Sequence, residues 1–138
     1  MSDEPDRDGG DDEAETEREI AREVDRLVPR RLITGVVWYT PVEWARVKAI
    51  SADASSFEDT YEDWVAVVAD GIARIPSQHE GEMRPVNLTA DGLLEWSRQT
   101  GRVLDSQARV EYMMLLLRQQ QDAVREATRR MLRERRSR

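Results

Sequence analysis

The sequence contains no cysteine, a single histidine and a single lysine. The absence of cysteine excludes a disulfide framework, a thiolate zinc site and a cysteine nucleophile. A metal site built on histidine needs at least one further nitrogen or sulfur ligand, and His79 has none. Its neighbours in a polar loop are Glu80 and Glu82, which is typical of a solvated side chain. We therefore expect neither a metal nor a cofactor.

Catalytic motifs are also missing. The chain has no glycine-rich phosphate loop, no nucleophile elbow and no zinc-protease helix. Catalysis would have to depend on carboxylates, tyrosines or Lys48, because the usual activated bases and nucleophiles are absent. The sequence favours a non-catalytic protein, and we predict no catalytic residues. A small carboxylate-based enzyme is the less favoured alternative.

Long hydrophobic runs are absent, and no stretch approaches the ~20 apolar residues of a membrane span. The first twenty residues are charged, unlike the basic and then apolar pattern of a secretory signal. We expect a soluble, cytoplasmic protein that does not bind membranes.

Charge is distributed unevenly along the chain, whose net charge is −7. Residues 1–25 carry twelve acidic and three basic side chains, whereas residues 101–138 carry ten arginines and five acidic side chains. The middle of the chain is nearly balanced. Oppositely charged ends of this kind indicate interaction tails.

The composition divides the chain into four segments. Residues 1–12 have no apolar side chain after Met1 and are predicted to be disordered. Residues 13–29 predict a short amphipathic helix that docks through a narrow apolar stripe and ends at Pro29. Residues 30–120 form the expected globular core, and residues 121–138 a basic helical extension.

Local chemistry predicts the elements of the core. A β-branched and aromatic run predicts a strand over 33–39, and Thr40 then caps a helix over 41–51. A second helix over 57–75 is expected to begin at Ser55 or Ser56. A second strand over 83–88 contains Pro85, which confines it to an edge or an irregular pairing.

Two further helices complete the core. Thr89 and Gly101 bound a helix over 90–100, and Asp105 caps a long helix over 106–135. The fold class is therefore α+β and mainly α, with four to five helices, a small two-stranded β element and a long C-terminal helix. The expected buried residues are Val36, Trp38, Trp44, Trp64, Val68, Ile72, Leu93, Trp96, Met113, Met114 and Leu117.

Four tryptophans are many for 138 residues. They favour a core role in which each indole N–H finds a partner, with a ligand platform as the alternative. Trp38 and Trp44 flank the transition from strand to helix and could line one cleft together with Glu43. An enzyme would use this cleft with Glu43, Glu62 or Arg46.

The segment YMMLLL, residues 112–117, is apolar around the whole circumference of its helix. A helix of this kind is covered on more than one side. We therefore predict a non-catalytic protein-interaction module that self-associates as a homodimer or binds a protein partner through this helix. The predicted interaction surface comprises Tyr112, Leu115, Leu116, Leu117, Val124 and Met131, where Leu117, Val124 and Met131 recur every seven residues after Val110.

The arginine-rich C-terminal end gives an alternative function. It predicts phosphate contacts of a nucleic-acid-binding protein, with the acidic N-terminal tail as a competitor. A solvated helix end or pairing of the two charged tails explains the same arginines and is favoured by the acidic net charge. The predicted nucleic-acid contacts are Arg125, Arg129, Arg130, Arg133, Arg135 and Arg136.

Several short motifs occur in a fixed order: WYTPVEW (38–44), FEDTYEDW (57–64), MRPVNL (83–88), LLEW (93–96) and DSQARVEY (105–112). With these motifs the chain resembles a family of small uncharacterised bacterial proteins over about residues 33–118. The resemblance implies one compact domain with appended tails, and it implies no activity.

Overall fold

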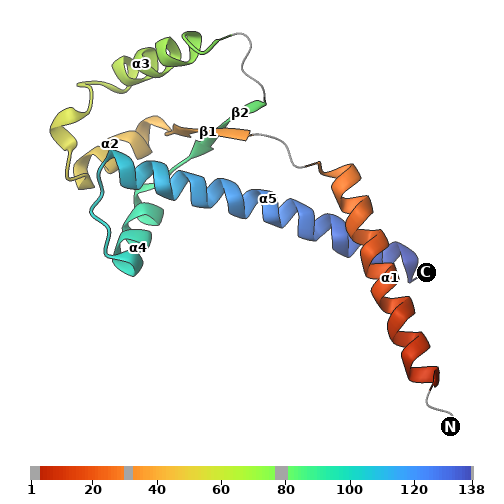
Figure 1. The fold of residues 1–138 in the computed structure, drawn as a ribbon. Coiled ribbons are helices and arrows are strands. Elements are labelled where there is room, and N and C mark those ends of the chain that lie inside the picture. The colour runs from red at the N-terminus through yellow and green to blue at the C-terminus, as the bar shows by residue number, and fades with distance from the viewer. Residues whose placement is uncertain (1–3, 30–32, 77–80, 138) are drawn as a thin grey trace. The chain divides into compact units, whose positions relative to one another are not determined.

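The computed structural model describes residues 4–29, 33–76 and 81–137 (Figure 1). The chain divides into two compact units. The larger one comprises residues 32–118, and the smaller one comprises residues 1–31 together with 119–138. His79, which is predicted to be a solvated loop side chain, lies outside the described residues. In chain order the elements are α1 (Glu4–Leu27), β1 (Ile33–Trp38), α2 (Pro41–Ile50), a short 3-10 helix (Ala54–Ser56), α3 (Tyr61–Ala73), β2 (Glu82–Asn87), α4 (Ala90–Thr100) and α5 (Ser106–Arg136).

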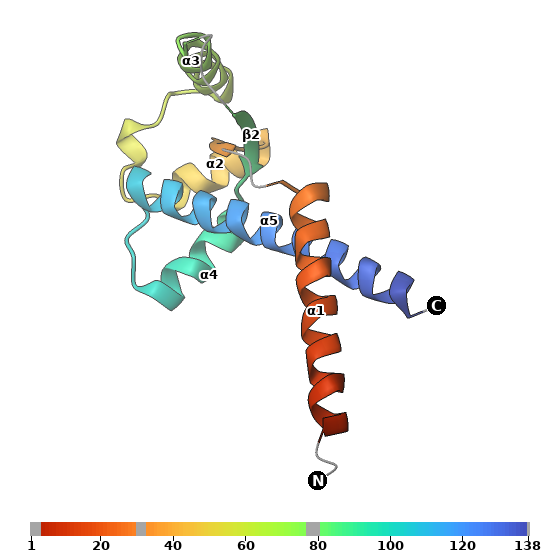
Figure 2. The same cartoon turned by 45° about the vertical axis from the view of Figure 1, so that its right-hand side comes forward.

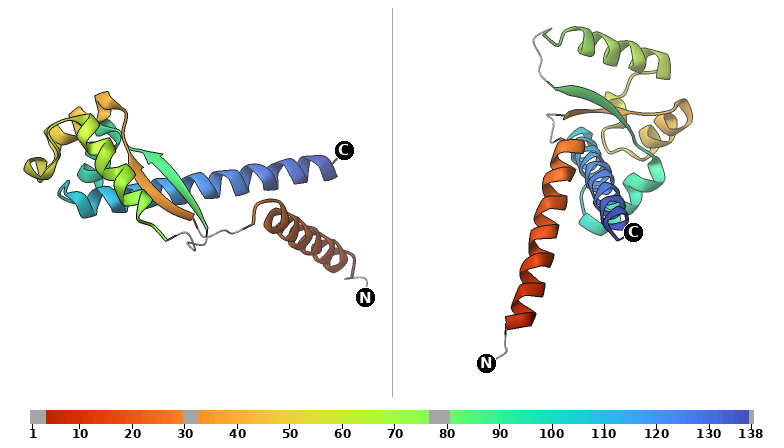
Figure 3. Two further views of the ribbon diagram at one scale, coloured as in Figure 1. Left: turned by 90° about the horizontal axis from the view of Figure 1, so that it is seen from above. Right: turned by 90° about the vertical axis from the view of Figure 1, so that its right-hand side faces the viewer.

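The predicted fold class is confirmed: the protein is mainly helical, with a small two-stranded sheet and a long C-terminal helix. β1 and β2 pair in parallel, in a register that runs from Ile33 opposite Glu82 to Trp38 opposite Asn87. Parallel pairing requires a crossover connection, and α2 and α3 form it. Within the larger unit, α3 lies on one side of the sheet and the first part of α5 on the other (Figures 1 and 3).

Side-chain caps fix the starts of three helices as predicted. The hydroxyl of Thr40 accepts a hydrogen bond from the amide of Glu43 in α2, and Thr89 plays the same part for α4. The carboxylate of Asp105 accepts from the amide of Ala108 at 2.8 Å. Gly101 ends α4 with φ of 72°, a left-handed conformation that glycine adopts without strain.

The predicted start of α3 is wrong. Thr60, rather than Ser55 or Ser56, caps this helix, and its hydroxyl accepts from the amide of Asp63 at 3.1 Å. Thr60 has the extended backbone of an N-cap and is followed by acidic residues, so it offers the same cap chemistry several residues later. The residues before it form the short 3-10 helix.

The core of the larger unit lies between α2, α4, β2 and α5, and the buried residues Trp44, Leu93, Met113 and Leu117 belong to it as predicted. The expectation of burial is wrong for Ile72, which is 42% exposed, and for Met114, which is 53% exposed. Ile72 is exposed because α3 buries none of its residues fully. Five further residues of the expected set are half-buried: Val36, Trp38, Trp64, Val68 and Trp96.

The buried indole N–H of Trp44 has no hydrogen-bond partner within the described residues. This contradicts the expectation that every indole N–H is paired. The ring instead packs between Phe57 and Tyr61, with the ammonium group of Lys48 5.2 Å from its centre. Trp44 is therefore held by apolar and cation–π contacts.

In the smaller unit, α1 runs across the C-terminal half of α5 (Figure 2). Ile20 and Val24 of α1 are buried against Leu132 of α5, whereas Leu27 is 45% exposed. The helix begins at Glu4, while the sequence predicts a helix only from residue 13; residues 1–3 lie outside the description. Among the described helices none is long and apolar enough to cross a bilayer.

Candidate functional site

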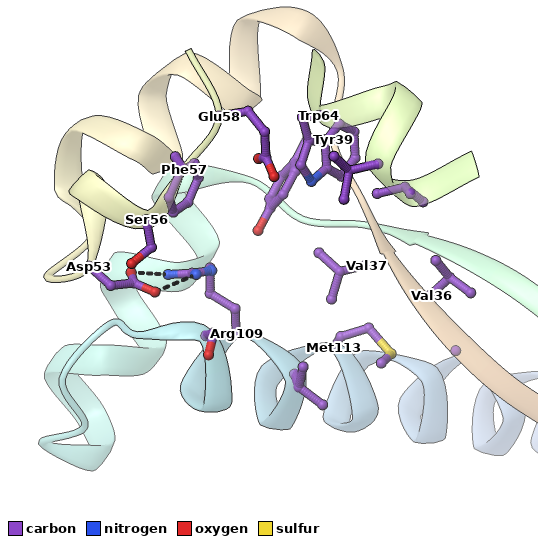
Figure 4. Close-up of a pocket in the computed structure, with 15 residues that line it drawn as sticks. Val36, Val37, Tyr39, Asp53, Ser56, Phe57, Glu58, Trp64, Arg109 and Met113 are labelled. Carbon is purple, nitrogen blue, oxygen red and sulfur yellow. Dashed lines mark hydrogen bonds and ion pairs between the residues drawn. The ribbon is translucent and has the colours of Figure 1, made fainter. Parts of the chain in front are cut away.

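The larger unit contains a cavity of about 590 Å³, here called the β1 cavity. β1 forms its back wall, α3 one side and the first turns of α5 the opposite side (Figure 4). Its apolar lining includes Val37, Val67, Val68, Val110 and Met113. A volume of this size and an apolar lining with a few polar groups are typical of binding sites.

One edge of β1 opens into this cavity. The carbonyl of Trp38 accepts a hydrogen bond from the amide of Leu88, so the backbone groups of Trp38 point toward β2. Because residues of a strand alternate in direction, those of Gly35 and Val37 point away from β2. Both residues line the β1 cavity. Within the described residues the sheet consists of β1 and β2, so no strand pairs with this edge.

The outer edge of β2 differs from that of β1. Leu88 donates to β1, and by alternation the backbone of Pro85 points away from β1. Proline has no N–H to donate, so an added strand would lack a hydrogen bond at the middle of this edge. Pro85 thus lies at an edge, as its sequence position predicts.

Arg109 and Asp53 form the polar end of the β1 cavity. Two guanidinium nitrogens of Arg109 donate to the two carboxylate oxygens of Asp53 at 2.7 and 2.9 Å, and one also donates to the hydroxyl of Ser51 at 3.2 Å. The side-chain hydrogen bond from Arg109 holds the pKa of Asp53 below its usual range. The guanidinium also lies 4.7 Å from the ring centre of Phe57. This arrangement is a closed ion pair with its hydrogen bonds largely satisfied.

Tyr39, Glu58 and two serines, Ser56 and Ser106, also belong to the polar lining. Burial raises the pKa of Tyr39 to about 12, so its hydroxyl stays protonated at neutral pH. The carboxylate of Glu58 points toward the rings of Tyr39 and Trp64 (Figure 4). This half-buried carboxylate has no ion-pair partner within the described part of the chain. The ammonium group of Lys48 lies nearby but donates to the backbone carbonyl of Glu58 at 2.9 Å.

A second cavity of about 460 Å³ lies on the face of the sheet that α3 covers. It is lined by alternate residues of the two strands, which is what a strand's period of two requires. Ile72 of α3 covers it in part. The lining residues are Val36, Trp38, Ile72, Met83, Pro85 and Asn87.

The residues of the predicted tryptophan cleft lie in different environments. Trp38 lines the second cavity and packs against Trp64 in a tilted arrangement with 5.0 Å between ring centres, whereas Trp44 lies in the core. Glu43 pairs with Arg46 at 2.8 Å, and Arg46 also binds Asp91. Of the two cavities, neither has Trp44 or Glu43 in its lining, and the same holds for Glu62, which is exposed at the start of α3.

The predicted interaction surface on α5 is partly used by the chain itself. Leu117 is 8% exposed and packs in the core, and Tyr112, Leu115 and Leu116 are half-buried. The large apolar side chains of this helix that are exposed in the larger unit are Val110 and Met114. In the smaller unit, Val124 and Met131 are exposed.

Several of the C-terminal arginines pair with acidic residues of α1. Arg133 binds Glu17 at 3.0 Å and Arg136 binds Glu19 at 2.8 Å. The hydrogen bond from Arg133 lowers the pKa of Glu17. The nucleic-acid alternative therefore requires these pairs to break. The other predicted contacts are Arg125, which binds Asp25 and the carbonyl of Val28, Arg129, which binds Glu126, and Arg130 and Arg135, which are exposed.

Sequence reasoning missed the β1 cavity and its polar end. Asp53 and Arg109 are 56 residues apart, and neither belongs to a recognisable motif. No three histidine, aspartate or glutamate side chains of the described residues gather as a metal site.

Comparison with known proteins adds no information about function. No protein-family model, no curated protein and no solved structure matches the chain. The chemistry of the β1 cavity is therefore the basis for interpreting this protein.

Proposed function

We propose that this chain is a non-catalytic protein-interaction module whose binding site is the β1 cavity. The observation that carries the proposal is an apolar cavity alongside a strand edge with unpaired backbone groups. Apolar walls gain free energy when a partner's side chains displace water, and strand edges pair readily with extended segments of other chains.

The polar groups of the cavity support a non-catalytic role. Asp53 and Arg109 neutralise each other in a bidentate pair, and Tyr39 holds its proton because its pKa is about 12. Glu58 is then the one carboxylate of the lining outside an ion pair, and a general base needs a nucleophile or a second acid nearby. The lining is suited to recognition through shape and hydrogen bonds.

A selection experiment tests the proposed function. A random dodecapeptide library displayed on phage, selected against the immobilised full chain, should yield ligands with micromolar Kd. Val67→Arg should weaken them ~tenfold or more, because Val67 is 55% exposed at the cavity and the larger side chain blocks it. Ala66→Arg, the adjacent exposed position outside the lining, should leave binding unchanged. Ligands indifferent to Val67→Arg would contradict the proposal.

Self-association through α5 is a second candidate, favoured by the exposure of Val110 and Met114 one turn apart on this helix. Adjacent exposed apolar side chains of this kind are a common feature of helix–helix contacts. In sedimentation equilibrium the chain should be a dimer at high concentration, and Met114→Glu should weaken the dimer ~tenfold, since it places a charge in the interface. Gln119→Glu adds the same charge at an exposed position on the opposite face of α5 and is the control. A monomeric wild-type chain would rule out this candidate.

A further inference from the structure

We propose that the occupant of the β1 cavity is an extended segment of a partner protein, which joins β1 as an added strand and places a basic side chain beside Glu58. The inference rests on the proposed function and specifies the conformation and chemistry of the partner. Three features carry it: the direction of the backbone groups of β1, the size of the cavity and the charge of Glu58.

The backbone of β1 offers a short set of donors and acceptors. Gly35 and Val37 each point one N–H and one C=O away from β2 and line the cavity. The next outward carbonyl, that of Tyr39, already accepts a hydrogen bond from the hydroxyl of Tyr61 at 2.9 Å. Tyr61 thus closes the edge at one end. An extended chain can pair with the remaining groups, whereas a helix cannot, because its own backbone groups are paired internally.

The cavity volume fits such a segment. A strand residue occupies ~160 Å³. This volume is the product of ~4.8 Å between neighbouring strands, ~10 Å between packed layers and ~3.3 Å of rise per residue. A cavity of about 590 Å³ therefore holds about four extended residues. Four residues are enough to pair with both Gly35 and Val37, which lie two positions apart on β1.

The two helices beside β1 determine which side chains fit. Val67 and Val68 of α3 face the cavity from one side, and Val110 and Met113 of α5 from the other. Successive side chains of a strand point to opposite faces, so each wall receives alternate residues of the segment. Both walls are apolar, and we therefore expect β-branched or other apolar residues at the positions between the polar ones.

Charge selects a basic residue for the polar end of the segment. Asp53 is neutralised by Arg109, whereas the half-buried carboxylate of Glu58 forms no ion pair among the described residues, since the nearby ammonium group of Lys48 binds its backbone carbonyl instead. A lysine or arginine of the segment supplies that partner, whereas an acidic side chain would be repelled. The acidic N-terminal residues of a second copy are disfavoured as the occupant for the same reason.

Strand addition is restricted to this edge of the sheet. Pro85 leaves the outer edge of β2 without a donor at its centre, so an incoming strand there would lose a hydrogen bond. β1 contains no proline, and Gly35 has no side chain that could point toward the helices. An added Cβ at Gly35 would lie 2.3 Å from the sulfur of Met113, so the strand and α5 approach each other closely at this point.

Backbone methylation of the selected peptides tests the pairing. N-methyl groups introduced one at a time should weaken binding ~tenfold or more at two positions separated by one residue, because those N–H groups bond to β1. Methylation at the intervening residue should change Kd less than ~threefold. Peptides that Val67→Arg excludes but that show no alternation, or that bind as helices, would overturn the strand inference and leave the proposed function standing. If selection yields no peptides sensitive to Val67→Arg, both are overturned.

Replacement of Glu58 tests the charge. Glu58→Gln should weaken a lysine-containing peptide ~fivefold at low salt and leave its norleucine analogue unchanged. Asp59→Asn removes the same charge from an exposed neighbour outside the cavity lining and should have no such selectivity. Equal effects of Glu58→Gln and Asp59→Asn on the lysine peptide, or equal effects of Glu58→Gln on the two peptides, would show that Glu58 does not contact a basic side chain. Either result would overturn that part of the inference.

Discussion

Replacing Met113 with alanine should destabilise the larger unit by about 3 kcal/mol, because truncating a buried methionine loses its apolar burial and leaves a void. Met113 is 4% exposed and belongs to the core. Its thioether fills the space beside Gly35, where an added Cβ would lie only 2.3 Å from the sulfur. Urea denaturation followed by tryptophan fluorescence measures the loss.

Met114→Ala is the matched control. The same change is made one residue along the helix, at a side chain that is 53% exposed, and it should cost less than about 0.5 kcal/mol. Because Met113 also lines the β1 cavity, its truncation should deepen the cavity floor and admit a bulkier side chain of a bound peptide. Equal losses for the two variants would show that the side chain of Met113 does not support the fold.

Replacing Arg109 with leucine should cost about 2 kcal/mol at pH 7, because it leaves the carboxylate of Asp53 without its partner. The cost is below that of a fully buried pair, since the side chain of Asp53 is 24% exposed and water can reach it. Arg102→Leu is the control: its pair with Glu111 is 37% and 41% exposed, and such pairs contribute less than about 1 kcal/mol.

The effect of Arg109→Leu should depend on pH. In the folded protein Arg109 holds the pKa of Asp53 below its usual range, while in the unfolded chain the pKa has its ordinary value of about 4. The stabilisation is therefore fully present above pH ~4 and is lost as the pH falls through the lower, folded-state pKa. The difference between wild type and variant should shrink when denaturation is measured at pH 3. A difference that does not change with pH would assign the effect to packing of Arg109 on Phe57.

The elements that sequence reasoning predicted well are those determined by neighbouring residues. Thr40, Thr89 and Asp105 each form a cap with an amide three residues later, so the starts of α2, α4 and α5 can be read locally. The start of α3 was missed because the chain contains two competing cap sites, Ser55–Ser56 and Thr60. Local chemistry alone does not rank them.

The candidate site could not be predicted, because it depends on residues that are distant in the sequence. The edge of β1 is defined only when β2 pairs with the opposite side, 49 residues later at Ile33 and Glu82. Asp53 and Arg109 meet only when the start of α5 lies beside the short 3-10 helix. Periodicity shows that Ile72 lies on an apolar face, but not that this face covers an unfilled cavity.

The uneven charge distribution along the sequence, by contrast, corresponds to ion pairs between the two ends of the chain. The sequence left open whether the tails bind nucleic acid, remain solvated or pair with each other. The ion pairs of Glu17 with Arg133 and of Glu19 with Arg136 correspond to pairing of the tails. A count of charges cannot identify these partners, which are more than a hundred residues apart.

Pro85 has a consequence for the behaviour of the protein at high concentration. Fibres built from β-strands require every subunit to hydrogen-bond through two edges, one to the subunit before it and one to the subunit after it. Here one of the two edges lacks the central donor, so each further junction through that edge is disfavoured by a missing hydrogen bond. The same proline that makes β2 a poor strand by propensity thus protects a small exposed sheet from amyloid-like growth.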